Sequence, residues 1–284
     1  MTHARPSATI VVPAHNEEFG LSRLLPRLLG SAERGEFRVI VVCNGCTDGS
    51  ANEAGKHGPD VEVITLAQPS KAAALEAGCA AVSAFPVAFV DADVALDTDS
   101  LRALLALVGR PGILAAGPER RLERGRVSRA AGWYYDIWER LPSVKSGLFG
   151  RGVIVVSEAG FRRVSGLPHF VSDDLAFSES FEPVERSIAP DSVVSVWPAR
   201  TWRSLLGRRI RVVHGNRELA AAGRISKSAS TVVGDLVRIV REEPRMATRL
   251  PVFLVTTIVS RLLERRTRAS RTSTWMRDET SRAT

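Results

Sequence analysis

Two acidic residues separated by one position, Asp91 and Asp93, follow an apolar run at 86–90. Carboxylates at the end of an otherwise buried strand are costly to place without a compensating charge. Because side chains two apart in an extended strand point to the same side, we expect both carboxylates to face one way. A hard divalent cation, Mg²⁺ or Mn²⁺, would neutralise them, with substrate phosphates completing its coordination shell. The triplet Asp91-Ala92-Asp93 therefore indicates a metal site that serves a phosphate-bearing substrate.

Three other polar segments stand beside apolar runs in the first half of the chain. Asn16 and Glu17 follow the first run, where they can cap the next helix. A polar turn at 43–50 follows the second run and can either cap a helix or hydrogen-bond a nucleobase. Lys71 opens a helical segment after the third run, against the direction of the helix macrodipole. An anionic ligand such as a diphosphate would explain this lysine, and a tolerated surface lysine is the alternative.

The elements that must position these residues are visible in the periodicity. Short β-branched runs indicate buried strands at 9–13, 37–42, 61–66 and 87–91. Apolar residues at helical spacing fill the intervals, at 17–29, 50–57, 70–84 and 98–108. Such alternation predicts an α/β fold with a Rossmann-like, mostly parallel central sheet flanked by helices. Ligands bind these sheets at the carboxyl ends of the strands, which is where the polar segments stand.

The pattern loosens after residue 112. Aromatic residues at 133–138 have the helical spacing of core residues, and stacking on a sugar or lipid is the alternative. We expect their acidic neighbours Asp136 and Glu139 to be solvated. A strand at 153–156, an acidic pair at 173–174 and a basic helix around 201–219 follow, and the last forty residues form appended helices.

Composition limits the class of protein. The chain has 284 residues, of which 44% are hydrophobic and 25% charged, as in an ordinary soluble globular protein. Its three cysteines do not make a secreted disulfide framework. Cys43 and Cys46 have no second Cys or His pair at ligand spacing, so we interpret them as small turn residues. No apolar stretch has the length of a signal peptide or a membrane span, which predicts a cytoplasmic location.

The net charge of +8 is concentrated near the C-terminus. Residues 245–284 hold nine arginines and three acids, a net charge of +6. This basic segment overlaps an apolar stretch at 250–263, a combination that suits peripheral contact with an anionic membrane, on its inner face. A solvated arginine-rich helix is the alternative. Nucleic acid is not expected as a partner, because interleaved aromatics and recognition motifs are lacking.

Four segments resemble, in order and spacing, those of family-2 glycosyltransferases with the GT-A fold. They are VVPAHNEE at 11–18, NGCTDGS at 44–50, KAAALEAG at 71–78 and DAD at 91–93. Ser172-Asp173-Asp174 resembles the acidic catalytic pair of that family. Residues 208–215 resemble a degenerate Q-x-x-R-W motif, whose lost Gln and Trp favour the addition of single sugars. The resemblance spans about residues 7–220 and rests on the ordered set rather than on any one piece.

The resemblance implies a metal-dependent, inverting transfer of a sugar from a nucleoside-diphosphate sugar to a hydroxyl acceptor. Asp93 would hold the Mn²⁺ or Mg²⁺, and Asp174, assisted by Asp173, would be the general base. The donor-binding residues that it implies are Pro13, Ala14, Glu17, Asn44, Asp48, Lys71, Asp91, Ala92, Arg208 and Arg211.

Within that set, Asp91 would contact the ribose and Asn44 the nucleobase. The family often has an acidic residue at the position of Asn44, and an amide offers both donor and acceptor, so the base preference stays open. For Arg208 and Arg211, a solvated basic helix face is the alternative.

The domain organisation that we expect follows from this resemblance. Residues 1–222 would form the GT-A domain, with a nucleotide-binding half at 1–117 and an acceptor-binding half at 118–222. Residues 223–284 would form a basic helical C-terminal extension. The implied acceptor is a polysaccharide or lipid-linked glycan precursor, used in cell-envelope or exopolysaccharide synthesis.

Two other functions remain open at this level. A sugar-phosphate nucleotidyltransferase shares nucleotide, metal and sheet, but its usual glycine-rich loop after the first strand is replaced here by AHNEE at 14–18. A catalytically degenerate, membrane-associated scaffold would explain the altered Q-x-x-R-W region, but not the intact DAD. Dehydrogenase and P-loop enzymes fit poorly, because the first strand is not followed by G-x-G-x-x-G and the P-loop spacing is not met.

Overall fold

The computed structural model describes residues 6–167, 173–224 and 231–269. The chain divides into two compact units, each discontinuous in sequence. The first comprises residues 1–122, 150–169 and 180–196, and the second comprises residues 123–149, 170–179 and 197–284. The domain boundaries expected after residues 117 and 222 stay a prediction, and positions 225–230 and 270–284 of the expected extension lie outside the described residues.

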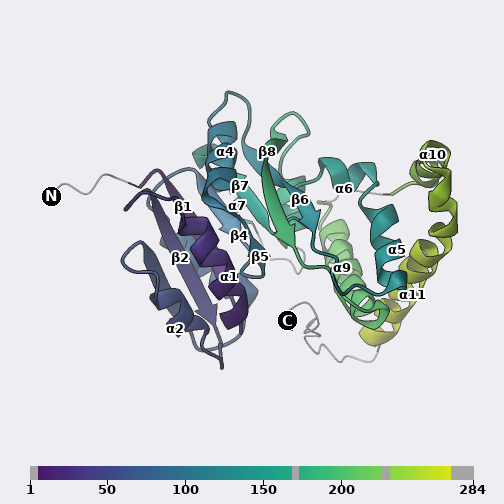
Figure 1. The fold of residues 1–284 in the computed structure, drawn as a ribbon, viewed down its shortest axis with the longest axis horizontal. Coiled ribbons are helices and arrows are strands. Elements are labelled where there is room, and N and C mark those ends of the chain that lie inside the picture. Colours follow the sequence, from purple (N-terminus) through teal and green to yellow (C-terminus); the bar gives the residue numbers. More distant parts are fainter. Residues whose placement is uncertain (1–5, 168–172, 225–230, 270–284) are drawn as a thin grey trace. The chain divides into compact units, whose positions relative to one another are not determined.

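An eight-stranded sheet forms the first unit, in the order β3-β2-β1-β4-β7-β6-β8-β5 (Figure 1). β1 is parallel to β2 and β4, and β2 is parallel to β3. β7 is antiparallel to both of its neighbours, whereas β6 and β8 are parallel. The mostly parallel sheet predicted from the sequence is therefore confirmed. The strands are Ala8–Ala14 (β1), Phe37–Asn44 (β2), Val61–Leu66 (β3), Val87–Val90 (β4), Val94–Ala95 (β5), Ala115–Leu122 (β6), Val153–Val156 (β7) and Arg186–Val196 (β8).

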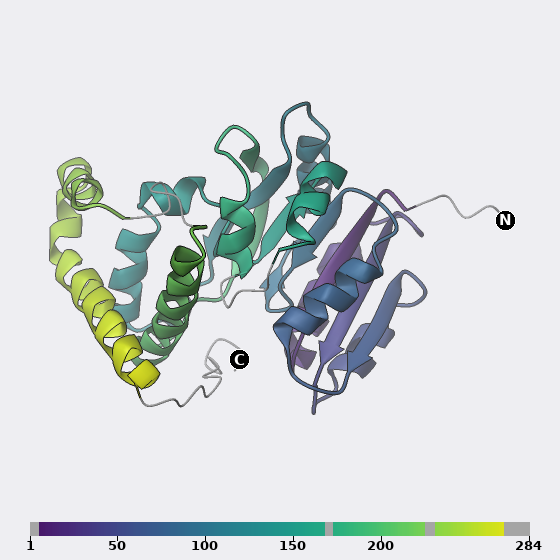
Figure 2. The ribbon, with the colours of Figure 1, turned by 180° about the vertical axis from the view of Figure 1, so that it is seen from behind.

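Helices cover both faces of this sheet because its central strands are apolar on both sides. Val39 and Val41 of β2 belong to the core beneath α1 and α4, and the alternate residues Ile40 and Val42 pack with Ala74 of α3 on the opposite face. Figure 1 shows α1 in front of the sheet, and in the reverse view of Figure 2 the blue helix α3 lies in front of the opposite face. The helices of this unit are Glu18–Leu29 (α1), Ser50–Gly55 (α2), Lys71–Ala80 (α3), Thr98–Val108 (α4) and Glu158–Val164 (α7).

Helices α3 and α4 of the first unit each begin directly after a capping side chain. Ser70 Oγ accepts a hydrogen bond from Ala73 N at 3.2 Å and begins α3, and Asp97 does the same for α4 through Ser100 N at 2.7 Å. These side chains satisfy amide groups that the first helical turn leaves without partners. α3 therefore starts at Lys71, directly after its cap, which fixes the lysine at the carboxyl edge of the sheet.

The second unit is helical in its described part. α11 packs against α9 and α5, and its sequence contains the apolar stretch at 250–263. The predicted C-terminal helices are confirmed, and no helix among the described residues is long and apolar enough to cross a membrane. The elements are Arg129–Trp138 (α5), Pro142–Ser146 (α6), Asp173–Glu179 (α8), Trp202–Ala221 (α9), Val233–Glu242 (α10), Pro244–Thr248 (the 3₁₀ helix η2) and Leu250–Ala269 (α11).

The aromatic cluster of α5 forms part of the core of the second unit. Tyr134 is buried and stacks on Phe253 of α11, with 5.1 Å between the ring centroids. Tyr135 is also buried, and its hydroxyl accepts a hydrogen bond from Ala199 N at 3.1 Å. This confirms the prediction that the spacing of these residues is that of core packing.

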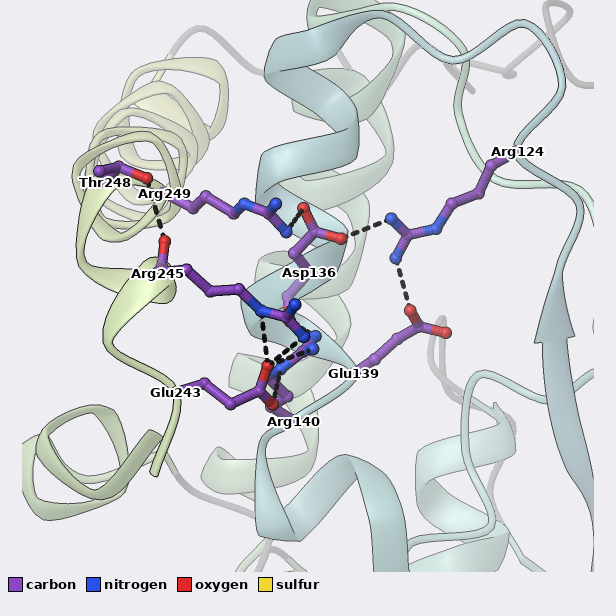
Figure 3. A network of polar contacts seen from close by, with 8 residues as sticks. All are labelled: Arg124, Asp136, Glu139, Arg140, Glu243, Arg245, Thr248 and Arg249. Atoms are coloured by element: carbon purple, nitrogen blue, oxygen red, sulfur yellow. Dashed lines mark hydrogen bonds and ion pairs between the residues drawn. The ribbon is translucent and has the colours of Figure 1, made fainter. Parts of the chain in front are cut away.

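Asp136 of α5 and Glu139 just after it are partly buried in ion pairs, so the expectation of solvated side chains was wrong. Asp136 accepts hydrogen bonds from Arg124 at 2.6 Å and from Arg249 at 2.5 Å, and Glu139 accepts one from Arg124 at 2.5 Å (Figure 3). The arginines that pair with these carboxylates come from other segments of the chain. The pattern of charges around residues 136–139 therefore does not predict the pairing.

A third carboxylate in the same network joins the segment after α5 to the segment before α11. Glu243 accepts from Arg140 Nε at 2.6 Å and from Arg245 Nη2 at 2.9 Å (Figure 3). Hydrogen bonding by Arg140, followed by that of Arg245, lowers the pKa of Glu243 to about 2. Glu243 is therefore charged at neutral pH.

Candidate active site

The ends of β1, β2 and β4 lie at one edge of the sheet. Ala14 at the end of β1 is level with Cys43 of β2, and Val11 is level with Phe89 of β4. Parallel pairing brings the carboxyl ends of neighbouring strands to the same edge, where ligands of such sheets bind. The first-unit residues expected to bind the donor follow these strand ends or the N-terminus of α3.

Asn44 ties three of these segments together. Its side chain is buried, its Nδ2 donates to Ala14 O at 2.7 Å, and its Oδ1 accepts from Ser70 N at 3.0 Å. The ends of β1 and β2 and the cap of α3 are thus held by one amide. The contact with a nucleobase stays a prediction, and the structure adds a positioning role that the sequence did not suggest.

The turn after β1 is hydrogen-bonded to the turn after β2. Asn16 adopts a left-handed backbone conformation, with φ of 52°, and its Oδ1 accepts from Thr47 N at 2.7 Å. Asparagine tolerates this region better than most residues. Glu17 is buried, and its backbone N donates to Ser50 Oγ at 2.8 Å. Glu17 is therefore held at the edge of the sheet where the strands end.

Asp48 joins the same two turns. Its carboxylate accepts from Ser50 Oγ at 2.5 Å, from Ser50 N at 3.0 Å and from Glu18 N at 3.2 Å. Burial raises the pKa of Asp48, but these hydrogen bonds outweigh it and lower the pKa overall. The carboxylate is used to cap α2 and to hold the start of α1, and its contact with a donor stays a prediction.

The Asp91–Asp93 triplet forms a turn rather than an extension of β4. The strand ends at Val90, and Asp91 N then donates to Gly152 O at 2.7 Å. Asp91 O accepts from Val94 N at 3.4 Å, and the chain turns there into β5. The straight-strand geometry from which we expected both carboxylates to face one way was therefore wrong. Both acidic residues are nevertheless partly exposed at this edge.

Two residues of α1 that the sequence analysis missed position this turn. Arg23 Nη2 donates to Asp93 O at 2.6 Å. Gly20 faces the buried Ala92 so closely that a β-carbon there would lie 2.4 Å from Ala92 O. A glycine in the first turn of a helix weakens the helix, so its occurrence three residues after Glu17 was an available signal of close approach.

Lys71 has an acidic partner in the site. Its Nζ lies 3.1 Å from Asp91 Oδ1, and the two side chains are 37% and 40% exposed. The lysine at the N-terminus of α3, unfavourable for the macrodipole, is therefore compensated by a carboxylate from the end of β4. Proximity to a nucleotide stays a prediction for both residues.

The oxygen donors of the triplet fit a hard divalent cation. Asp91 and Asp93 supply carboxylates, the ligands that Mg²⁺ and Mn²⁺ prefer. Within the described ranges, no three His, Cys, Asp or Glu side chains gather closely enough to hold a metal by themselves. A cation here would take its remaining ligands from phosphate oxygens and water, as nucleotide-bound Mg²⁺ does.

The cysteines near this edge are structural. Burial raises the pKa of Cys43 to about 12, with a further contribution from Cys46. Cys46 Sγ accepts from Asn16 N at 3.4 Å. A thiol with a raised pKa is a poor nucleophile and metal ligand, which argues against both roles for Cys43. Cys43 is a buried residue of β2, so its interpretation as a turn residue was wrong, whereas Cys46 lies in the turn after β2.

The remaining predicted site residues belong to the second unit. Asp174 lies in the first turn of α8, where its Oδ1 accepts from Leu175 N at 2.8 Å. Ser172 and the side chain of Asp173 lie outside the described residues. Arg208 and Arg211 lie on α9 and are partly exposed. The roles of base and of donor ligands stay predictions for these residues.

Comparisons with solved structures show what fold this is. The mannosyltransferase PcManGT of Pyrobaculum calidifontis, in complex with GDP-Man and Mn²⁺, has a TM-score of 0.60 and 20% identity, covering 95% of this chain and 77% of that one. Glucosyl-3-phosphoglycerate synthase of Mycobacterium tuberculosis, in complex with Mn²⁺, UDP-Glc and phosphoglyceric acid, has a TM-score of 0.57 and 17% identity, covering 78% and 82%. The predicted GT-A fold is confirmed.

Sequence comparison shows the family. The uncharacterised glycosyltransferases Rv0539 of Mycobacterium tuberculosis and Mb0553 of Mycobacterium bovis are 33% identical over 117 residues, covering 41% of this chain. That match covers 50% of each relative, so the chain spans about half the length of the curated relatives it matches. A family model described as glycosyl transferase family 2 matches residues 9–156, just over half of the 284 residues. The chain belongs to glycosyl transferase family 2.

Proposed function

We propose that the chain is an inverting, metal-dependent glycosyltransferase. It moves a sugar from a nucleoside-diphosphate sugar to a hydroxyl of a polysaccharide or lipid-linked glycan precursor, in the synthesis of cell envelope or exopolysaccharide. Its proposed place is the cytoplasm, peripheral on the inner face of the membrane. A sugar-phosphate nucleotidyltransferase is a poorer candidate, because the family model that matches is that of a glycosyltransferase.

One observation carries the proposal. The turns after β1, β2 and β4 and the start of α3 are locked together by Asn44 and by the contact of Lys71 with Asp91. A buried amide, two partly exposed carboxylates and a lysine therefore meet at the edge of the sheet where nucleotides bind in α/β proteins. Two structures with the same fold add support, since one holds GDP-Man with Mn²⁺ and the other UDP-Glc with Mn²⁺.

The donor is proposed to bind through residues of the first unit. Asp91 contacts the ribose, and Lys71 lies near the diphosphate. Asp93 holds the cation, which, when bound, would neutralise charge on the leaving diphosphate. Asn44 keeps β1, β2 and α3 in register and presents its remaining hydrogen-bonding capacity to the base.

The reaction is proposed as a single displacement at the anomeric carbon. The acceptor oxygen forms a bond to that carbon while the bond from the carbon to the diphosphate oxygen breaks. The electron pair of the broken bond leaves with the nucleoside diphosphate. The proton of the acceptor hydroxyl passes to the carboxylate of Asp174, with Asp173 assisting.

A donor screen with purified protein and Mn²⁺, scored by release of nucleoside diphosphate, tests the proposal first. Calorimetry then separates the roles of the carboxylates. Asp174→Asn should abolish transfer and leave metal-dependent nucleotide binding intact. Asp93→Asn should weaken that binding, because it removes the proposed metal ligand.

Asp191→Asn is the matched control, since this carboxylate is exposed on β8 and has no proposed role. Its binding and transfer should equal those of the wild type. Full activity of Asp174→Asn would remove that residue from its role. Failure of the wild type to bind any common nucleotide with Mn²⁺ would overturn the proposal and favour the scaffold alternative.

A further inference from the structure

Helix α11 has buried polar side chains on its inner side and exposed large apolar side chains on its outer side. Thr256, Ser260 and Glu264 are buried, at 0%, 0% and 2% exposure. Four large apolar side chains of the same helix are exposed, at 39–54% of their surface. They are Leu254, Val255, Ile258 and Leu262. A surface helix in water ordinarily has the opposite arrangement.

The inward polar face is explained by the packing of α11 against α9. Thr256 Oγ1 accepts a hydrogen bond from Trp202 Nε1 at 2.9 Å. Eight residues later, Glu264 forms an ion pair with Arg217 of α9, and His214 lies 3.5 Å from the same carboxylate. These contacts, together with the stacking of Phe253 on α5, hold α11 in place. Its outward apolar side chains are therefore not needed for the fold of this unit.

The exposed residues form one continuous face. Leu254, Ile258 and Leu262 recur every four residues, and at 1.5 Å per residue they extend along about 12 Å of the helix. Seen down the helix axis, with 100° of rotation per residue, these three residues, Val255 and three arginines of α11 lie within an arc of about 140°. We call this set the outer face of α11, and it consists of Leu254, Val255, Ile258, Arg261, Leu262, Arg265 and Arg266.

The charges on the outer face have one sign. Arg261, Arg265 and Arg266 are exposed, and none of them forms an ion pair with any residue in the described ranges. Glu264, the acid of α11, is turned inward. By contrast, Arg249 just before the helix is paired with Asp136. Exposed arginines therefore lie at the borders and the C-terminal end of the apolar surface.

We propose that the outer face of α11 binds the surface of an anionic phospholipid bilayer. The helix lies in the plane of the interface, with Leu254, Ile258 and Leu262 among the upper acyl chains and the arginines at the headgroups. Amphipathic helices with apolar residues on one side and flanking cations bind anionic interfaces in this way. The charge of this face selects anionic lipid, because an uncharged bilayer offers the arginines no counter-charge. The inference does not depend on the proposed catalytic function.

Sedimentation of the full chain with vesicles tests the proposal. We expect binding to vesicles of phosphatidylcholine with phosphatidylglycerol and weak binding to phosphatidylcholine alone. Each arginine near an anionic surface strengthens binding roughly fivefold, so replacing Arg261, Arg265 and Arg266 with Gln should lower it about a hundredfold at low salt. Replacing Leu254, Ile258 and Leu262 with Gln should lower it at least tenfold at any salt concentration, because the apolar contribution is not screened.

The matched control for charge replaces Arg27, Arg34 and Arg110 of the first unit with Gln, which removes the same formal charge from exposed positions. Val184→Gln, at a valine that is 82% exposed, is the control for apolar surface. Both controls should bind vesicles as the wild type does. All variants should keep the wild-type melting temperature, since every substituted side chain is partly or fully exposed.

Two outcomes would overturn the proposal. One is a wild type that does not bind anionic vesicles, or whose binding is unchanged by both outer-face variants. The other is a wild type that is dimeric by analytical ultracentrifugation and becomes monomeric in the apolar variant without loss of vesicle binding. The second result would assign the outer face to another copy of this chain.

Discussion

Replacement of Gly20 by alanine measures how closely α1 must approach the turn at Asp91–Asp93. The new β-carbon would lie 2.4 Å from Ala92 O and 3.0 Å from Glu17 Oε2. Since non-bonded atoms prefer separations of about 3.5 Å, the helix or the turn must move by about 1 Å. The backbone oxygen of Ala92 cannot swing aside as a flexible side chain would. The turn at Asp91–Asp93, which carries the proposed metal ligand Asp93, therefore moves together with Ala92.

The expected effects on stability and activity differ in size. Overpacking costs about 1–3 kcal/mol, and the better helix propensity of alanine returns roughly 1 kcal/mol. The free energy of unfolding should thus fall by about 0–2 kcal/mol. A misplacement of 1 Å at a catalytic centre costs roughly a hundredfold in rate. We expect kcat/KM for nucleoside diphosphate release to fall by about that factor, with the protein still folded.

Gly132→Ala is the matched control. Gly132 lies within α5, and a β-carbon there would meet nothing within 4 Å. This variant should gain about 0.5–1 kcal/mol in urea unfolding and keep wild-type kcat/KM. The reasoning would be refuted if Gly20→Ala had wild-type kcat/KM, or if its loss of activity merely followed a large loss of folded protein.

Three further predictions concern Asn44, Glu243 and the divalent metal. Asn44→Ala should lower the free energy of unfolding by about 2–4 kcal/mol in urea titrations, because Ala14 O and Ser70 N each lose a buried partner; a loss below 1 kcal/mol would contradict this. Glu243 has a folded pKa of about 2 against an ordinary 4.5, so its contribution to stability is present above pH 4.5 and is lost as the pH falls from 4.5 to about 2. Thermal unfolding of Glu243→Gln should accordingly depend less on pH in that window than that of the wild type, and an unchanged pH profile would refute the assignment. Removal of divalent metal with EDTA should abolish nucleotide binding in calorimetry but leave the melting temperature unchanged, because within the described chain no group of side chains holds a metal by itself; a lower melting temperature would mean that a metal is part of the fold.

The first half of the sheet was predictable because its signals are local. Buried β-branched runs predicted β1 to β4 to within a few residues. A helix follows each of β1, β2 and β3 directly, whereas the short β5 separates β4 from α4. The strands β6 and β8 were missed, since Glu119 to Leu122 and much of β8 carry polar residues that resemble a loop. Their pairing joins segments separated by about seventy residues, which no local pattern encodes.

Within the site, residue identity was easier to predict than geometry. The order of Asn44, Lys71, Asp91 and Asp93 indicated a nucleotide edge, and the structure places all four in the first unit. That Asn44 bonds to Ala14 and to the cap of α3 could not be predicted, because hydrogen-bond partners depend on register. The bend at Asp91 was missed for the same reason, since it depends on pairing with Gly152 across the sheet.

The contact between Lys71 and Asp91 makes donor binding an exchange of counter-ions. In the free protein the ammonium group already neutralises one carboxylate of the triplet, so the edge is stable before any cation arrives. An ion pair as exposed as this one is worth about 0–1 kcal/mol. In the proposed donor complex, Lys71 exchanges Asp91 for the diphosphate, and Asp91 exchanges the ammonium group for ribose hydroxyls, while Asp93 holds the cation. The charge of the divalent cation balances that of the diphosphate ester, so the net charge of the site is the same before and after binding, and the affinity for a metal nucleotide should depend only weakly on ionic strength.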